Sequence, residues 1–312
     1  MRTGETAMSG GDWLLLLTLA ALWSGSFLYV AVALAALPPL TVVLGRVGLG
    51  ALALLGLIAL RGERLPRAPR AWGAMLVMGA LNNAIPFTLI AWAQTRIDSG
   101  LAAICNATTP LFTVALAALL GVQPLSPARL AGLACGLGGV MLLVGPAALG
   151  GLGRAGWGEA AVLAAALSYA AASLHGRRLR QHPPLVAAAG MLCGATLLLA
   201  PLALAVDRPW RLPPPGAAAL LAVLAVALLS TALAYRLYFR ILASAGATNL
   251  MLVTLIMPAG ALLLGALVLG ERVGPRALAG MTLIAAGLTA IDGRAPRWLA
   301  SRVAATVRSR VS

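Results

Sequence analysis

Hydroxyl, amide and aromatic side chains interrupt the long apolar stretches of this sequence, and they are its candidates for chemistry. Trp23, Ser24 and Phe27 fall in the first stretch, and Asn82 and Asn83 are neighbours in the third. A polar group at bilayer depth is costly unless it pairs or faces water. The concentration of these groups at one depth therefore predicts a cavity that binds a polar small molecule. The other members of this predicted substrate-binding set are Asn106, Tyr169, Ser230, Thr231 and Tyr235.

A structural alternative stays open for these polar side chains. Hydroxyl groups such as those of Ser24 and Ser230 also serve as hydrogen bonds between membrane helices, worth about 0.6–2 kcal/mol each. This alternative suits Asn82 and Asn83 less well, because adjacent residues of an α-helix do not both face the same packed neighbour.

Arg46 is the charged candidate, and it stands well inside the second apolar stretch. About eight residues precede it there, which places it roughly 12 Å deep at 1.5 Å per residue. An arginine at that depth faces either the protein interior or water. Two interpretations stay open: a packing residue bonded to carbonyl groups, or a positive group beside an anionic substrate. Arg236 lies near the end of its stretch, where its side chain is expected to reach the membrane surface.

The sequence lacks the residues that a proton relay, a metal site, a catalytic site or a channel would need at the appropriate positions. Glu159 and Glu271 lie at the ends of apolar stretches, and no carboxylate occupies a middle, where a proton relay usually needs one. Cys105, Cys135 and Cys193 have neither a disulfide framework nor metal-ligand spacing. We expect no metal, no cofactor and no catalytic residue, because neither a metal motif nor a nucleophile with its base is present. A channel would need a ring of charges or a carbonyl filter, and neither is visible.

The elements that must position these side chains are membrane helices. Hydrophobic residues make up 61% of the chain and charged residues 10%, with a mean hydropathy of +0.95. Apolar stretches of about twenty residues match the thickness of a bilayer core, and backbone groups in lipid must pair within a helix. We predict an all-α membrane protein with ten transmembrane segments, at about 13–34, 38–60, 71–94, 98–121, 127–145, 157–178, 184–205, 216–240, 246–269 and 275–292.

The arginines between these segments predict the orientation of the chain. All 23 basic residues are arginine, giving a formal net charge of +15. With the N-terminus in the cytoplasm, the cytoplasmic segments carry 15 arginines and the outer loops 6. Cytoplasmic loops are the ones that carry excess positive charge. Both termini are therefore expected inside, and the charge is explained without a nucleic-acid partner.

The two halves of the chain repeat each other. Sliding the sequence by 148 positions lays 81–143 over 229–291, with Pro110 on Pro258 and no gap. Each proline removes a backbone hydrogen bond inside a predicted segment, and the pair is expected to form matching hinges. An odd number of segments per unit inserts the second unit upside down, which is typical of secondary transporters. We predict a first five-helix repeat at 1–150, an inverted second repeat at 151–292 and a basic cytoplasmic tail at 293–312.

Several different short motifs are distributed along almost the whole chain. The first and second segments carry Leu22-Trp23-Ser24-Gly25-Ser26-Phe27 and Leu44-Gly45-Arg46. The other motifs are Ala91-Trp92-Ala93, Gly100-Leu101-Ala102, Pro110, Leu119-Leu120-Gly121, Gly132, Gly139 and Leu269-Gly270-Glu271-Arg272.

As a set, these motifs resemble those of the EamA-type transporters of the drug/metabolite transporter superfamily. The chain departs from the family pattern at Gln123, where the family usually has glutamate, whereas Glu271 keeps the acid. The resemblance implies a bacterial inner-membrane exporter of small metabolites, and its character is most similar to the amino-acid exporters, including the aromatic amino-acid type.

We therefore expect a secondary transporter that exports amino acids or related metabolites by alternating access, as a facilitator. Its partners would be the small-molecule substrate and membrane lipid, with the protein a monomer or weak homodimer. One alternative is a transporter of phosphorylated sugars or nucleotides, which would need several cations in the cavity where Arg46 is the clear candidate. Another alternative, an intramembrane enzyme, lacks the residues named above.

Overall fold

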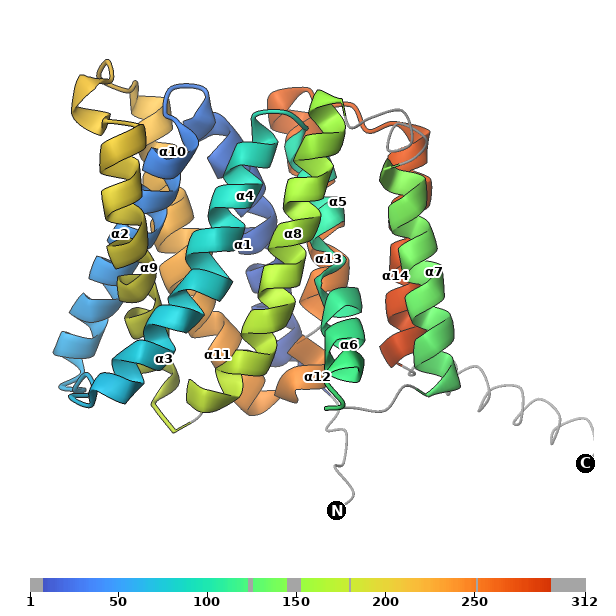
Figure 1. Ribbon diagram of the computed structural model, residues 1–312, viewed down its shortest axis with the longest axis horizontal. Helices are drawn as coiled ribbons and strands as arrows, with labels where there is room; N and C mark the ends of the chain where they lie inside the picture. Colours follow the sequence, from blue (N-terminus) through green and yellow to red (C-terminus); the bar gives the residue numbers. More distant parts are fainter. Residues whose placement is uncertain (1–7, 123–125, 145–152, 180, 251, 293–312) are drawn as a thin grey trace, which may run out of the picture.

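A computed structural model describes residues 8–122, 126–144, 153–179, 181–250 and 252–292. Within these ranges the regular structure is entirely helical and no strand occurs. The helices stand side by side as one bundle (Figure 1). The predicted tail at 293–312, the boundary between the predicted repeats and Gln123 lie outside the described residues.

The first half of the bundle contains α1 to α7. Its bounds are α1 (Gly10–Leu34), α2 (Pro39–Leu60), α3 (Pro69–Gly79), the π-helical η1 (Ala80–Ala84), α4 (Ile85–Gln94), α5 (Ser99–Asn106), α6 (Thr109–Leu119) and α7 (Pro127–Val144).

The second half follows the same plan. Its bounds are α8 (Arg154–His175), the 3₁₀ turn η3 (Gly176–Leu179), α9 (Pro184–Val206), the 3₁₀ turn η4 (Pro209–Arg211), α10 (Ala217–Ala227), the π-helical η5 (Leu228–Leu233), α11 (Ala234–Ser244), α12 (Gly246–Leu250), α13 (Leu252–Leu264), the π-helical η6 (Gly265–Leu269) and α14 (Pro275–Asp292).

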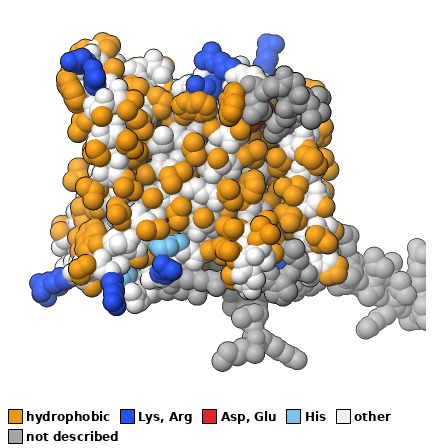
Figure 2. Space-filling model, in the orientation of Figure 1, with side chains coloured by type: hydrophobic (Ala, Val, Ile, Leu, Met, Phe, Trp, Pro, Cys, Tyr) orange, Lys and Arg blue, Asp and Glu red, His pale blue; other side chains and the backbone are white. Residues whose placement is uncertain are grey.

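Helical structure occupies each of the ten predicted segments. Eight helical spans of the described chain are long and apolar enough to cross a membrane, while α7 and α14 are shorter apolar helices. On the face in view, apolar side chains cover the middle of the molecule and arginines lie at its two ends (Figure 2). This distribution matches a slab of hydrocarbon between two charged surfaces.

Local sequence signals set the helix ends. Helix α1 begins earlier than predicted because Ser9 and Asp12 form a capping box, with the Asp12 amide donating to Ser9 Oγ over 3.1 Å. Proline opens α2 and α9, where its missing N–H costs nothing. Gly270 follows η6 in the left-handed region at φ 68°, a conformation that glycine adopts without strain.

Two π-helical turns occupy equivalent places in the two halves. The first, η1, begins at Ala80, in the third of the ten predicted segments. The second, η5, begins at Leu228, in the eighth of them. The offset of 148 between them is that of the sequence repeat. π-Turns are rare and concentrate at functional sites. Each of these two carries the adjacent polar residues of its half: Asn82 and Asn83 in η1, and Ser230 and Thr231 in η5.

Helices α7 and α14 pack against each other through reciprocal glycine contacts. A Cβ atom at Gly132 would lie 2.6 Å from the Gly287 carbonyl oxygen, and one at Gly139 would lie 2.8 Å from the Gly280 carbonyl oxygen. Gly280 and Gly287 are the repeat equivalents of Gly132 and Gly139. Gly132 therefore meets the equivalent of Gly139, and Gly139 meets the equivalent of Gly132, as in a pair of antiparallel helices related by a two-fold axis. The glycine face of α7 is thus used inside the chain.

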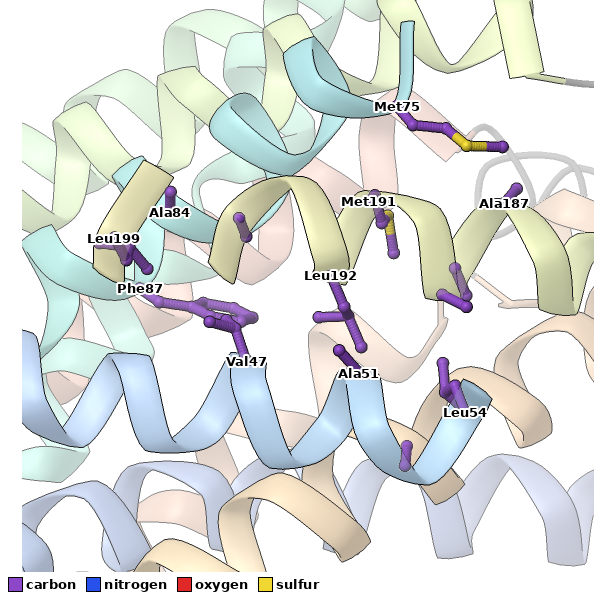
Figure 3. Packing of buried hydrophobic residues seen from close by; sticks show 14 of the residues in the cluster. Val47, Ala51, Leu54, Met75, Ala84, Phe87, Ala187, Met191, Leu192 and Leu199 are labelled. Atoms are coloured by element: carbon purple, nitrogen blue, oxygen red, sulfur yellow. The ribbon is translucent and has the colours of Figure 1, made fainter. Parts of the chain in front are cut away.

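The central core lies between α2, α9 and the broken third span. Val47, Ala51 and Leu54 of α2 face Leu192 of α9, and Phe87 of α4 lies against Val47 (Figure 3). These side chains bring three spans together next to Arg46, which precedes Val47 in the buried part of α2.

The two equivalent prolines do not have equivalent surroundings. The fourth span breaks at Ala107 and Thr108, so Pro110 lies in the first turn of α6, where a proline is tolerated. Pro258 instead lies inside α13, and the helix continues past it. The helix is therefore interrupted just before Pro110 and continuous at Pro258, and the expectation that the two prolines form matching hinges stays a prediction.

Candidate functional site

Arg46 lies at the centre of the candidate site, at the level of the two π-turns. Its side chain is 9% exposed, and its Nε donates to Thr231 Oγ1 of η5 over 3.1 Å. The guanidinium carbon stands 3.5 Å from the centroid of the Phe87 ring, a cation–π geometry. Among the described residues no carboxylate pairs with it. Arg46 is thus a buried cation held by neutral groups. Its two terminal nitrogens donate to no acceptor among the described residues.

Tyr235 connects the two halves of the chain at this level. Asn82 Nδ2 donates to Tyr235 Oη over 3.1 Å, and Asn83 Nδ2 donates to the same oxygen over 2.9 Å. Two adjacent asparagines therefore share one partner, which the α-helical argument from the sequence disfavoured. The π-turn explains the difference, because its wider turn separates neighbouring side chains by a smaller angle than an α-helix does.

Tyr169 of α8 completes the polar cluster. It packs against both of the two largest apolar clusters of the described chain, the first of which contains Phe87. Tyr235 packs against that first cluster as well. We call Arg46, Asn82, Asn83, Tyr169, Thr231 and Tyr235 the central cluster.

Unsatisfied acceptors mark the neighbourhood of the central cluster. The Oδ1 atom of Asn83 is buried and has no hydrogen-bond partner among the described residues, and the residue itself is fully buried. Thr88 Oγ1 of α4 is also buried without a partner among the described residues, although the residue as a whole is partly exposed. Buried polar atoms are nearly always hydrogen-bonded in proteins, so each exception calls for an explanation. A bound polar molecule would supply the missing donor.

The remaining predicted site residues make helix-to-helix contacts. Ser24 Oγ donates to the Met257 carbonyl over 2.9 Å, and Ser230 Oγ donates to the Leu22 carbonyl over 2.6 Å. These are the bonds of the structural alternative that the sequence left open. Trp23 packs against Tyr238, with ring centroids 5.9 Å apart.

Phe27 and Asn106 also have contacts away from Arg46. Phe27 belongs to an apolar cluster with Ile90 of α4 and Met257 of α13. The Asn106 carbonyl accepts a bond from Thr109 over 2.8 Å, and its Oδ1 is buried without a partner among the described residues.

Two residues beside the central cluster were not singled out from the sequence. Phe87 stacks on Arg46, and Met191 Sδ lies 3.9 Å from Asn82 Nδ2. Phe87 follows Asn83 by four positions, a helical spacing that places both on one face. That spacing was a usable signal for Phe87. Met191 comes from α9, and its approach depends on tertiary packing alone.

A pocket of about 220 Å³ leads toward the central cluster from the end of the molecule that carries the α2–α3 connection. Tyr235 lines it, together with Arg61, Glu63 and Arg236 and with apolar residues of α9 and α11. Helix α1 begins and helix α14 ends at the same end of the bundle (Figure 1). This entrance pocket meets the central cluster at Tyr235, which belongs to both.

The carboxylates stand apart from the central cluster. Glu271 caps the start of α5 from the opposite half of the chain: it accepts bonds from the Ser99 amide over 2.8 Å, the Ser99 hydroxyl over 2.9 Å and the Gly100 amide over 3.1 Å. The acid of the Leu-Gly-Glu-Arg motif therefore satisfies a helix N-terminus. Glu159 is 8% exposed and is the sixth residue of α8. It is more deeply buried than its place near a helix end suggests.

The sequence matches the model of the EamA-like transporter family twice, at residues 11–145 and 156–291. The chain belongs to this family, within the drug/metabolite transporter superfamily. Each match covers one half of the bundle, so the EamA unit occurs as a repeat.

Two bacterial relatives illustrate the family. The chain is 28% identical over 290 residues to a probable amino-acid metabolite efflux pump of Salmonella typhimurium, covering 90% of this chain and 94% of that protein. It is 29% identical over 186 residues to the uncharacterized inner membrane transporter YedA of Escherichia coli K12. That second match spans 59% of this chain and 57% of YedA.

A solved crystal structure has the same fold. It superposes with a TM-score of 0.65 at 23% sequence identity, over 93% of this chain and 99% of that one. Together with the apolar helices, membership of the family identifies the chain as a multi-pass membrane protein.

Proposed function

We propose that this EamA-like transporter exports amino acids or closely related metabolites, and that the central cluster is its substrate site. The observation that carries the proposal is Arg46, a buried cation with no carboxylate partner among the described residues. A buried charge is costly unless it is paired, and the pairing is what a substrate carboxylate would supply. Its planar guanidinium suits a carboxylate bound through two hydrogen bonds.

The second charge of an amino acid has a matching group in the same place. Asn83 Oδ1 is a buried acceptor without a partner among the described residues. Asn83 is bonded to Tyr235 of α11, and α11 directly follows the η5 turn that carries Thr231, the partner of Arg46. An ammonium group would donate to this oxygen while the carboxylate binds Arg46. Phe87 and Tyr169 would then bound the side chain of the substrate. The Salmonella relative is a probable amino-acid metabolite efflux pump, which agrees with this substrate class.

A phosphorylated sugar or nucleotide fits the site less well. A phosphate group carries more negative charge than a carboxylate and is usually held by several cations. In the described part of the chain the central cluster offers Arg46 alone.

Transport by alternating access between the two halves would expose this cluster to each side in turn. The arginine distribution supports a cytoplasmic location for both termini, and hence an entrance pocket that faces the cytoplasm. The central cluster contains no carboxylate, which supports a facilitator that exports substrate down its own gradient.

The test is radiolabelled amino-acid exchange in proteoliposomes, with each of the other amino acids as competitor, for the wild type and Arg46→Gln. Loss of a charge-assisted hydrogen bond of about 1.5–3 kcal/mol predicts an exchange KM that rises roughly 10- to 100-fold. The thermal stability of Arg46→Gln should equal or exceed that of the wild type, because the variant no longer buries an unpaired charge.

Two results would overturn the proposal. The wild type could exchange none of the amino acids, which removes the substrate class. Alternatively, Arg46→Gln could exchange them with an unchanged KM, which removes the site.

A further inference from the structure

The entrance pocket has its own set of charged and apolar walls, separate from those of the central cluster. Arg61 and Glu63 come from the connection after α2, and Arg236 from α11. Leu185 of α9 and Phe239 of α11 supply apolar surface. Tyr235 is shared with the central cluster and marks the inner end.

The charges around the entrance pocket are poorly matched within the protein. Arg236 is exposed and has no hydrogen bond or ion pair with any described residue. Glu63 Oε1 lies 3.9 Å from Arg61 Nη1, a long contact for an ion pair. Glu63 Oε2 is shielded from solvent and has no partner in the described part of the chain. One pocket therefore presents an available cation and an under-paired carboxylate.

The remaining features of the pocket limit what could use both charges. Its volume of about 220 Å³ admits a molecule of amino-acid size. Leu185 and Phe239 provide an apolar wall, so the ligand carries an apolar portion as well as two opposite charges. An α-amino acid with an apolar or aromatic side chain has these three parts in one small molecule.

We infer that the entrance pocket is a capture site for zwitterionic α-amino acids, distinct from the central cluster. Arg236 binds the carboxylate, Glu63 binds the ammonium group, and the side chain lies on Leu185 and Phe239. The amino acid then passes Tyr235 to reach Arg46. This inference rests on the proposed amino-acid function, and it assigns to that function a first binding step and a preference for substrates that carry both charges.

Protection of an engineered cysteine measures occupancy of this pocket directly. Leu185→Cys would be introduced into protein without its native cysteines, purified in detergent and labelled with a maleimide. L-phenylalanine, added as the probe, should slow the labelling. In Arg236→Gln and Glu63→Gln, the concentration for half protection should rise roughly 10-fold or more, as expected for loss of one charge-assisted bond. Arg64→Gln, an exposed arginine next to Glu63 that does not line the pocket, should protect like the parent.

Probes with a single charge assign the two ends. 3-Phenylpropionate carries only the carboxylate and should lose its protection in Arg236→Gln but not in Glu63→Gln. Phenethylamine carries only the ammonium group and should show the reverse pattern. Equal effects of both variants on both probes would overturn the assignment.

Arg46→Gln separates this inference from the proposed function. Combined with Leu185→Cys, it should raise the KM for exchange roughly 10- to 100-fold while leaving protection by L-phenylalanine unchanged, because the capture site does not use Arg46. Protection lost together with exchange would mean that the pocket has no site of its own. If the wild type exchanges amino acids but the Arg236 and Glu63 variants protect normally, the capture site is wrong and the proposed function stands. If the wild type exchanges no amino acid and no amino acid protects the Leu185→Cys protein, the proposed function is wrong, and the capture site is wrong with it.

Discussion

The hydroxyl oxygen of Tyr235 accepts hydrogen bonds from two side-chain amides, and this determines what removal of the hydroxyl should do. In Tyr235→Phe the amides of Asn82 and Asn83 lose their acceptor while the ring stays in place. Buried donors without a partner cost about 1–3 kcal/mol, so the free energy of unfolding should fall by roughly that amount. The KM for exchange should also rise, because the unpaired amides no longer hold Asn83 Oδ1 in position. Thermal unfolding and exchange kinetics measure the two effects.

Tyr238→Phe is the matched control for that change. Tyr238 lies on the same helix and packs against Trp23 and Phe239 through its ring, and its hydroxyl has no hydrogen bond with any described residue. This variant should leave both stability and KM close to wild type. An equal effect of the two substitutions would show that the Tyr235 hydroxyl has no special part in the cluster.

At the scale of the elements, the packing of α7 against α14 predicts that alanine substitutions at two adjacent glycines change the melting temperature in opposite directions. Gly139 faces α14, where a Cβ would lie 2.8 Å from the Gly280 carbonyl oxygen, whereas a Cβ at Gly138 has no neighbour within 4 Å. Gly139→Ala should therefore lower the melting temperature, because one helix backbone must move away from the other. Gly138→Ala should raise it slightly, because alanine is better than glycine in a helix by about 0.8–1.0 kcal/mol.

The pair of variants is compared by thermal unfolding in one detergent. Both changes have the same helix propensity term, so a difference in sign isolates the contact between α7 and α14. Equal shifts for Gly138→Ala and Gly139→Ala would contradict the close packing of these helices.

At the scale of the whole molecule, the positions of the carboxylates predict how transport is driven. Glu271 is occupied as the cap of α5, and Glu159 is buried near the start of α8. Neither belongs to the central cluster. In substrate-loaded liposomes, an imposed pH gradient should neither drive uphill accumulation nor be dissipated by substrate, and reversal of the substrate gradient should reverse the flux.

Proton coupling would appear as uphill accumulation that a protonophore abolishes. Glu159→Gln and Glu271→Gln locate the responsible group in that case. Loss of coupling with retained exchange in Glu159→Gln would make the buried carboxylate of α8 the proton carrier and end the facilitator proposal.

The sequence by itself determined the fold class, the helical segments and the repeat. Membrane helices keep their backbone hydrogen bonds within one segment, so apolar length alone locates them. The repeat was visible as well, since Pro110 and Pro258 share the offset that later relates η1 to η5. Arg46 and the two asparagines stood out because polar groups at bilayer depth are rare and costly.

Only the tertiary structure decided which polar residues meet. Ser24 and Ser230 look like cavity residues in the sequence, yet they bond to the carbonyls of Met257 and Leu22. Asn82 and Asn83 look unable to share a partner, yet the π-turn lets both reach Tyr235 from the other half of the chain. The direction of a side chain around a helix axis depends on the local turn and on packing against distant helices, and a sequence pattern built on a regular α-helix contains neither.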